Sequence, residues 1–173
     1  INDLLDLSQI EAGAMALDLE KTDLFVLLSG VAEHAREWAA KAGLALELHC
    51  REDAGLFVAD PRRVRQILFN LLSNAFKYTP RGGTITLGGQ IKGEDVQVFV
   101  ADTGPGIPAE VKASAFESFA AKNAPAARGG AGLGLALVNR FVELHGGWVE
   151  LETAPGEGTR VTCHLPRQVK RTR

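Results

Sequence analysis

The sequence predicts an α+β fold that layers helices on a sheet, rather than a doubly wound parallel sheet. Stretches with helical periodicity and short alternating stretches follow one another without regular strand–helix alternation. Two pairs of alternating stretches are joined by short turns, which is typical of antiparallel hairpins. The chain has 173 residues, 46% of them apolar, which is enough for one buried core.

The first elements are a helix over residues 1 to about 15 and a short strand over 16–19. A second helix is predicted over 23–42, with Gly43 as its stop, because glycine readily adopts the left-handed conformation that ends helices. Alternation over 44–49 then predicts a half-buried strand. The apolar positions at helical spacing in the second helix are Leu27, Leu28, Val31, Ala35 and Trp38.

A third helix is predicted from Asp60 to about Tyr78. Asp60 can cap the free amides at a helix start, and Pro61 at the first helical position loses no hydrogen bond. The alternating stretches 84–88 and 96–101 follow, with a charged turn between them, and predict a hairpin.

Residues 103–132 lack sustained periodicity and are rich in Gly, Pro and Ala, so we expect a long loop of the kind that often forms a functional lid. A helix is predicted over about 133–145. Two closing strands, 148–153 and 159–165, are joined by a Pro-Gly-Glu-Gly turn at 155–158.

Charge and cysteine content exclude several classes of protein. A formal net charge of −2 argues against nucleic-acid binding, since the only basic cluster is the tail at 167–173. Cys50 and Cys163 lie far apart without metal-ligand spacing, so neither a zinc site nor a disulfide framework is expected, and a reducing, cytoplasmic location fits. No stretch approaches the roughly 18 apolar residues of a membrane span.

Four polar residues fall along one side of the third predicted helix: Asn70, Asn74, Lys77 and Tyr78. Asn is a weak helix former, so two in mid-helix need an explanation. One interpretation is a solvated polar face. The other is a set of amide oxygens and an ammonium directed at Mg²⁺ and phosphate. Apolar residues occupy the other side of the helix: Leu68, Leu71, Leu72 and Ala75.

Two glycine-rich segments are further candidates. Asp102 directly follows a predicted strand, where its carboxylate can accept a hydrogen bond from an exocyclic amine. Gly104 and Gly106 allow the backbone to approach a flat ring closely. An ordinary Asp-Gly turn is the alternative interpretation. The segment 129–135 leads straight into a helix, whose free amides favour an anion; a flexible hinge is the alternative. Neither a dinucleotide-binding fingerprint nor a Walker loop fits this context.

The order of these segments is more informative than any one of them. An Asn-bearing helix, an Asp-Gly-x-Gly loop, Phe116 and Phe119, a glycine-rich helix start and the Gly-x-Gly-Thr turn at 156–159 occur in the order of the asparagine, phenylalanine and glycine boxes of one superfamily. The chain resembles the histidine-kinase branch of the GHKL superfamily, which also holds type II topoisomerases, Hsp90 and MutL. The resemblance covers about residues 1–166.

The resemblance implies a two-layer α/β sandwich, with a mixed sheet covered by helices and ATP held under a mobile lid. Asp102 would bind the adenine amino group, and Asn74 would ligate Mg²⁺. Asn70 and Lys77 are the expected catalytic residues and would also line the nucleotide. The other nucleotide-binding positions implied are Tyr78, Gly104, Gly106, Ile107, Phe116, Gly130, Gly132, Leu133, Gly134, Leu135 and Thr159.

One position separates the branches of the superfamily. Hydrolytic members resemble one another in having Glu four residues before the Mg²⁺-binding Asn, where this chain has Asn70. Asn70 offers no basic carboxylate, so kinase activity is favoured over ATP hydrolysis. A serine-kinase anti-sigma factor is an alternative, but residues 1–14 look like the end of a dimerisation helix, which those proteins lack.

The resemblance also implies partners. None of the four histidines lies in the family's acceptor context, so we expect the γ-phosphate to pass to an acceptor on dimerisation helices of a homodimeric parent protein, and then to a response regulator. After Phe119 the family usually has an aromatic and a basic residue, whereas this chain has Ala120 and Ala121. Such a lid is similar to that of divergent, DivL-like members, and a signalling scaffold with little or no turnover is the alternative function.

Three segments are therefore expected. Residues 1–16 are the end of the dimerisation hairpin, 17–166 form the ATP-binding catalytic domain, and 167–173 are a basic tail.

Overall fold

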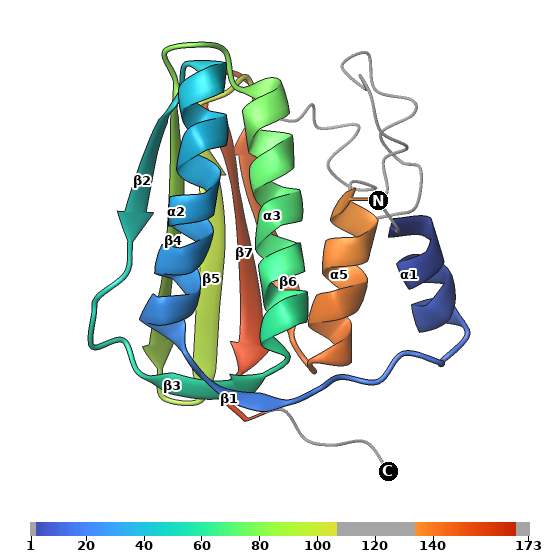
Figure 1. Cartoon of the computed structure of the whole chain (residues 1–173). Helices are drawn as coiled ribbons and strands as arrows, with labels where there is room; N and C mark the ends of the chain where they lie inside the picture. The colour runs from blue at the N-terminus through green and yellow to red at the C-terminus, as the bar shows by residue number, and fades with distance from the viewer. Residues whose placement is uncertain (1–2, 107–133, 169–173) are drawn as a thin grey trace.

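A five-stranded mixed sheet with helices on one face forms the body of the chain in the computed structural model, which describes residues 3–106 and 134–168 (Figure 1). The strands are β2 (Ala45–His49), β4 (Thr84–Lys92), β5 (Asp95–Asp102), β6 (Trp148–Ala154) and β7 (Gly158–Pro166). Their order is β2-β4-β5-β7-β6, with β2 and β4 parallel and the other pairs antiparallel. The predicted α+β class, the mixed sheet and both predicted hairpins are confirmed.

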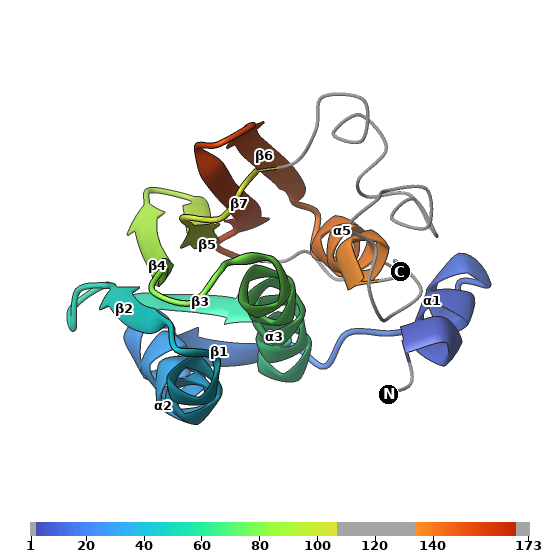
Figure 2. The same cartoon turned by 90° about the horizontal axis from the view of Figure 1, so that it is seen from above.

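The described helices are α1 (Asp3–Glu11), α2 (Leu24–Ala42), α3 (Pro61–Tyr78) and α5 (Gly134–Leu144). Seen from above, α2, α3 and α5 cover one side of the sheet, and α1 lies beside α5 (Figure 2). The predicted capping is confirmed: Asp60 accepts a hydrogen bond from the Arg63 amide at 3.3 Å, and Gly43 ends α2 with φ of 70°. These local signals explain why the predicted bounds of α2 and α3 agree closely with the structure.

A second, two-stranded sheet was not foreseen. β1 (Glu20–Asp23) pairs antiparallel with β3 (Leu56–Ala59). The strand predicted over 16–19 is wrong in position, because the observed strand β1 begins four residues later, and no strand is predicted where β3 lies. Each strand has four residues, and their pairing joins distant parts of the chain, so local alternation carries little signal for either.

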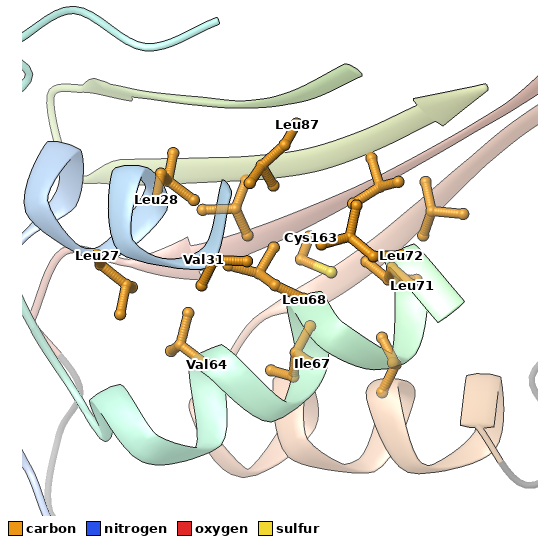
Figure 3. Packing of buried hydrophobic residues seen from close by; sticks show 14 of the residues in the cluster. Leu27, Leu28, Val31, Val64, Ile67, Leu68, Leu71, Leu72, Leu87 and Cys163 are labelled. Carbon is orange, nitrogen blue, oxygen red and sulfur yellow. The ribbon is translucent and has the colours of Figure 1, made fainter. Parts of the chain in front are cut away.

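The core lies between the sheet and helices α2, α3 and α5, and Figure 3 shows part of it. Leu28 from α2, Leu68 from α3, Leu87 from β4 and Cys163 from β7 are all fully buried. Burial raises the pKa of the Cys163 thiol to about 12. Trp38, one of the apolar positions at helical spacing in α2, is 42% exposed, and its ring contacts that of Phe69 on α3 with the centres 5.8 Å apart.

Helices α3 and α5 are joined by a buried histidine. His145, which directly follows α5, accepts a hydrogen bond at Nε2 from the Asp60 amide at 3.1 Å. Its Nδ1 lies 2.8 Å from the carbonyl oxygen of Phe141 and therefore carries the proton. Since the end of α5 meets the start of α3, the two helices run antiparallel.

Both ends of the described chain contact this body. The Asp18 amide donates to the Asp60 carboxylate at 2.9 Å, which ties the segment after α1 to the start of α3. Arg167, placed in the tail by the sequence, donates to the carbonyls of Leu56 and Gly93. No helix in the described ranges is both long and apolar enough to cross a membrane.

Candidate functional site

Asp102 is the last residue of β5 and lies between two neighbouring strands, in register with Ile85 of β4 and Thr159 of β7. Its carboxylate is half-buried and accepts a hydrogen bond from the Gly104 amide at 2.9 Å. Burial raises the pKa of Asp102, while backbone hydrogen bonds from Gly104 and Thr159 oppose that shift. A carboxylate fixed in this way can accept a hydrogen bond from an amine of a bound ligand.

Gly104 is the point where the loop after β5 meets the end of α3. A Cβ atom at this position would lie 3.0 Å from Asp102 Oδ1, 3.1 Å from the Tyr78 carbonyl oxygen and 3.3 Å from Thr79 Oγ1. A side chain here would be tightly packed against these three groups, which favours glycine at this position. Gly104 is predicted as a nucleotide-site glycine, and the structure places it beside both Asp102 and Tyr78.

Thr79 is a residue that sequence reasoning missed. It is buried, and its hydroxyl has no hydrogen-bond partner among the described residues. Threonine directly after a helix and before proline is typical of a helix stop, so only the fold shows that this hydroxyl lies next to Gly104.

The turn between β6 and β7 supports the Asp102 loop. The Gly156 amide donates to the Pro105 carbonyl at 2.7 Å. Gly158 has φ of +81°, and a Cβ atom there would overlap the carbonyl oxygen of Asp102. Thr159, opposite Asp102, has its hydroxyl 2.9 Å from that of Thr153. The predicted turn is therefore a packing partner of the Asp102 loop as well as a connection.

The polar side of α3 is only partly exposed to solvent. Asn70 and Asn74 are half-buried, whereas Lys77 and Tyr78 are exposed. The side-chain nitrogen Nδ2 of Asn70 is buried and has no hydrogen-bond partner in the described part of the chain. Buried donors are rarely left unpaired, so the interpretation of a merely solvated face does not account for Asn70. A ligand oxygen would satisfy it.

The start of α5 lies beside the middle of α3 (Figure 1). Because the helices are antiparallel and α5 has 11 residues, its first turn is level with about the middle of α3, where Asn70 is located. Helix starts attract anions through their free amides. Gly134 begins α5, and Leu135 packs against the core.

Five predicted site residues lie outside the described residues: Ile107, Phe116, Gly130, Gly132 and Leu133. The lid segment with Ala120 and Ala121 lies there as well. Gly106, at the border of this segment, has φ of +80°, a conformation that suits glycine.

No group of three or more His, Cys, Asp or Glu side chains suited to a metal ion occurs within residues 3–106 and 134–168.

Comparison with known proteins matches residues 59–169 to the family described as histidine kinase-, DNA gyrase B- and HSP90-like ATPases. The sensor protein DivL of Caulobacter vibrioides is 46% identical over 166 residues, which are 96% of this chain and 21% of DivL. The circadian input-output histidine kinase CikA of Synechococcus elongatus is 44% identical over 174 residues, 97% of this chain and 23% of CikA. The chain thus spans about a fifth of the length of these relatives.

Solved structures agree with this match. Full-length ShkA in complex with AMPPNP has a TM-score of 0.86 and 34% identity, over 99% of this chain and 36% of that chain. The catalytic domain of the histidine kinase ThkA has a TM-score of 0.77 and 27% identity, over 88% of this chain and 99% of that chain.

Proposed function

Given that the chain belongs to the family of histidine kinase-, DNA gyrase B- and HSP90-like ATPases, we propose that Mg²⁺-ATP binds between Asp102 and helix α3. The chain is a nucleotide-binding catalytic domain of the sensor histidine kinase type. We further propose that the parent protein transfers the γ-phosphate to an acceptor on its dimerisation helices. Electrostatic clamping of phosphates is the main protein contribution to such a reaction.

The observation that carries the base-binding role is the fixed carboxylate of Asp102. It is held by the Gly104 amide, and its strand end is packed against Gly158. It would accept a hydrogen bond from the exocyclic amine of adenine, while Gly104 and Gly106 leave room for the flat ring. Thr159 supports this carboxylate through its amide.

The phosphate side of the site would be formed by α3 and the start of α5. The unpaired Nδ2 of Asn70 needs an acceptor, which a phosphate oxygen supplies. The amide oxygen of Asn74, one turn further on, is a suitable ligand for Mg²⁺, and Lys77 would neutralise phosphate charge. Tyr78, Gly134 and Leu135 would line the nucleotide, as would the family positions outside the described residues.

Kinase activity is favoured over hydrolysis because Asn70 cannot act as the general base that hydrolytic members have. It is also favoured over the scaffold alternative, because nearly the whole length of this chain is similar to proteins that are named as histidine kinases. A DivL-like divergence of the lid is predicted from Ala120 and Ala121, and DivL is among the relatives that this chain matches.

The rest of the assignment follows the same premise. Residues 1–16 would be the end of the dimerisation hairpin, 17–166 the catalytic domain and 167–173 the tail. The partners would be the acceptor helices of a homodimeric parent protein and a response regulator, in the cytoplasm.

Calorimetric titration of the chain with ATP, with and without Mg²⁺, tests the proposal. We expect Asp102→Asn to abolish ATP binding without loss of the fold. Asp95→Asn, the same change at the other end of β5, is the matched control and should bind as the unmodified chain does. Equal affinity in the two variants would contradict the role of Asp102. Phosphotransfer by the parent protein is the second measurement, and ATP binding without transfer would favour the scaffold.

A further inference from the structure

Two described side chains of helix α1 contact the catalytic fold. Asp6 and Ile10, one turn apart, point to the same side, and Ile10 packs against the edge of the core. Leu5 is 55% exposed. Beside Ile10 the contact with α5 is open, with a cavity of about 510 Å³ lined by Ile10, Glu11, Arg140, Glu143 and Leu144. At Ile10, therefore, the described packing between α1 and α5 is incomplete.

A chain of polar contacts also joins α1 to α3. Arg63 of α3 donates from Nη1 to Gln66 Oε1 at 3.1 Å, and Gln66 Nε2 donates to Asp6 Oδ2 at 2.9 Å. The Arg63 guanidinium also lies 4.0 Å from the Asp6 carboxylate and 5.4 Å from the ring centre of Phe141 on α5. We call Asp6, Gln66 and Arg63 the α1–α3 clamp.

The clamp is largely removed from solvent, since the side chains of Asp6 and Arg63 are 16% and 17% exposed. Buried polar contacts of this kind contribute little net stability compared with apolar packing, and in some proteins they fix the register of the helices they join. They also matter for α1 itself, because a free helix of nine residues is marginal in water.

The clamp sits on the helix that carries the proposed phosphate-binding residues. Gln66 is one helical turn before Asn70 and two turns before Asn74. Polar contacts therefore join α1 directly to α3, and Arg63 contacts the ring of Phe141 on α5 as well.

We propose that Asp6 is a positioning residue, which through Gln66 and Arg63 fixes α1 in one register on the catalytic fold and so sets where the ATP site stands relative to the helix that leads to the acceptor. The positioning role rests on the proposed function. The docking of α1 on the catalytic fold does not rest on the proposed function, so an experiment can refute the docking and the proposed function separately.

The clamp allows an isosteric exchange. Gln66→Glu places a second carboxylate against Asp6, with which it cannot share a hydrogen bond when both are ionised. Adding Asp6→Asn restores a donor and an acceptor, because the new amide at position 6 can donate to the new carboxylate at position 66, which still accepts from Arg63. The net charge of the double variant also returns to its original value. Gln90→Glu, on the exposed face of β4, is the matched control for the added charge.

Hydrogen–deuterium exchange of the full 173-residue chain is the first readout. We expect Gln66→Glu to speed exchange of the α1 amides on the order of tenfold, with the double variant and Gln90→Glu close to the unmodified chain. Unchanged α1 exchange in Gln66→Glu, or no recovery in the double variant, would overturn the clamp.

The second readout is kinetic and uses the same substitutions in the parent protein. We expect Gln66→Glu to change kcat for phosphotransfer with KM for ATP unchanged, and the double variant to restore kcat. Faster α1 exchange with an unaltered kcat would refute the positioning role. Failure of the unmodified chain to bind ATP would instead overturn the proposed function and leave the exchange result standing.

Discussion

Gly158→Ala is expected to damage the nucleotide site from the neighbouring strand. The new Cβ atom would lie 3.1 Å from the Asp102 carbonyl carbon and 3.3 Å from Thr103 Cα, and would overlap the carbonyl oxygen itself. Carbon atoms pack best at about 3.5–4.0 Å, so the end of β5 must shift on the order of 1 Å. A hydrogen bond to a charged group contributes about 1.5–3 kcal/mol, so misplacing the Asp102 carboxylate should weaken ATP binding on the order of 10- to 100-fold.

Stability falls in the same variant, so a control must separate the two effects. Alanine at φ of +81° costs about 1–2 kcal/mol, and crowding adds about 1–3 kcal/mol. Gly147→Ala produces a similar overlap with the carbonyl oxygen of His164, at the opposite end of β7. Denaturant unfolding gives the two stabilities, and calorimetry below both transitions gives the affinities. Wild-type affinity in Gly158→Ala, or an equal loss in Gly147→Ala, would refute the reasoning.

Three further outcomes are expected. Burial lowers the pKa of His145, so the neutral imidazole stabilises the folded state fully at pH values above the usual histidine pKa of about 6.5. As the pH falls below that value, the free energy of unfolding should decrease by up to about 1.4 kcal/mol per pH unit. His145→Gln should flatten this part of a profile of unfolding free energy against pH. Because burial raises the pKa of Asp102, ATP affinity should begin to fall on acidification at a higher pH than an ordinary carboxyl would give. Calorimetry at several pH values measures this fall, and an affinity that stays constant down to the pH range of an ordinary carboxyl would contradict the prediction. Asp60→Ala removes a helix cap and the acceptor of the Asp18 amide, and should cost about 1–2 kcal/mol in urea unfolding, whereas a cost near zero would show that the cap contributes nothing.

Much of the fold could be predicted because its signals are local. Asp60 and Gly43 mark helix ends through their own side-chain or backbone chemistry, and the hairpins follow from alternation and turns. The pairing of β1 with β3 has no such local cause. Trp38 shows another limit, since helical spacing gives the side of α2 on which it lies but not whether α3 covers it.

The candidate site was predictable as a set of segments but not as an arrangement. Asn70, Asp102 and Gly104 stood out because their types are unusual in a helix or at a strand end. Contact between the Gly158 turn and Asp102, and the burial of Thr79, depend on strand register and helix placement. Those are properties of the assembled sheet, and single residues do not encode them.

The buried thiol of Cys163 gives this domain an internal reporter of opening. Alkylating reagents attack the thiolate, and a group with a pKa of about 12 under a layer of helices offers almost none of it in the native state. Cys50 lies half-buried near the surface and can be replaced by serine. In that background, the labelling rate of Cys163 would follow separation of the helices from the sheet, and bound nucleotide would slow it by stabilising the closed molecule.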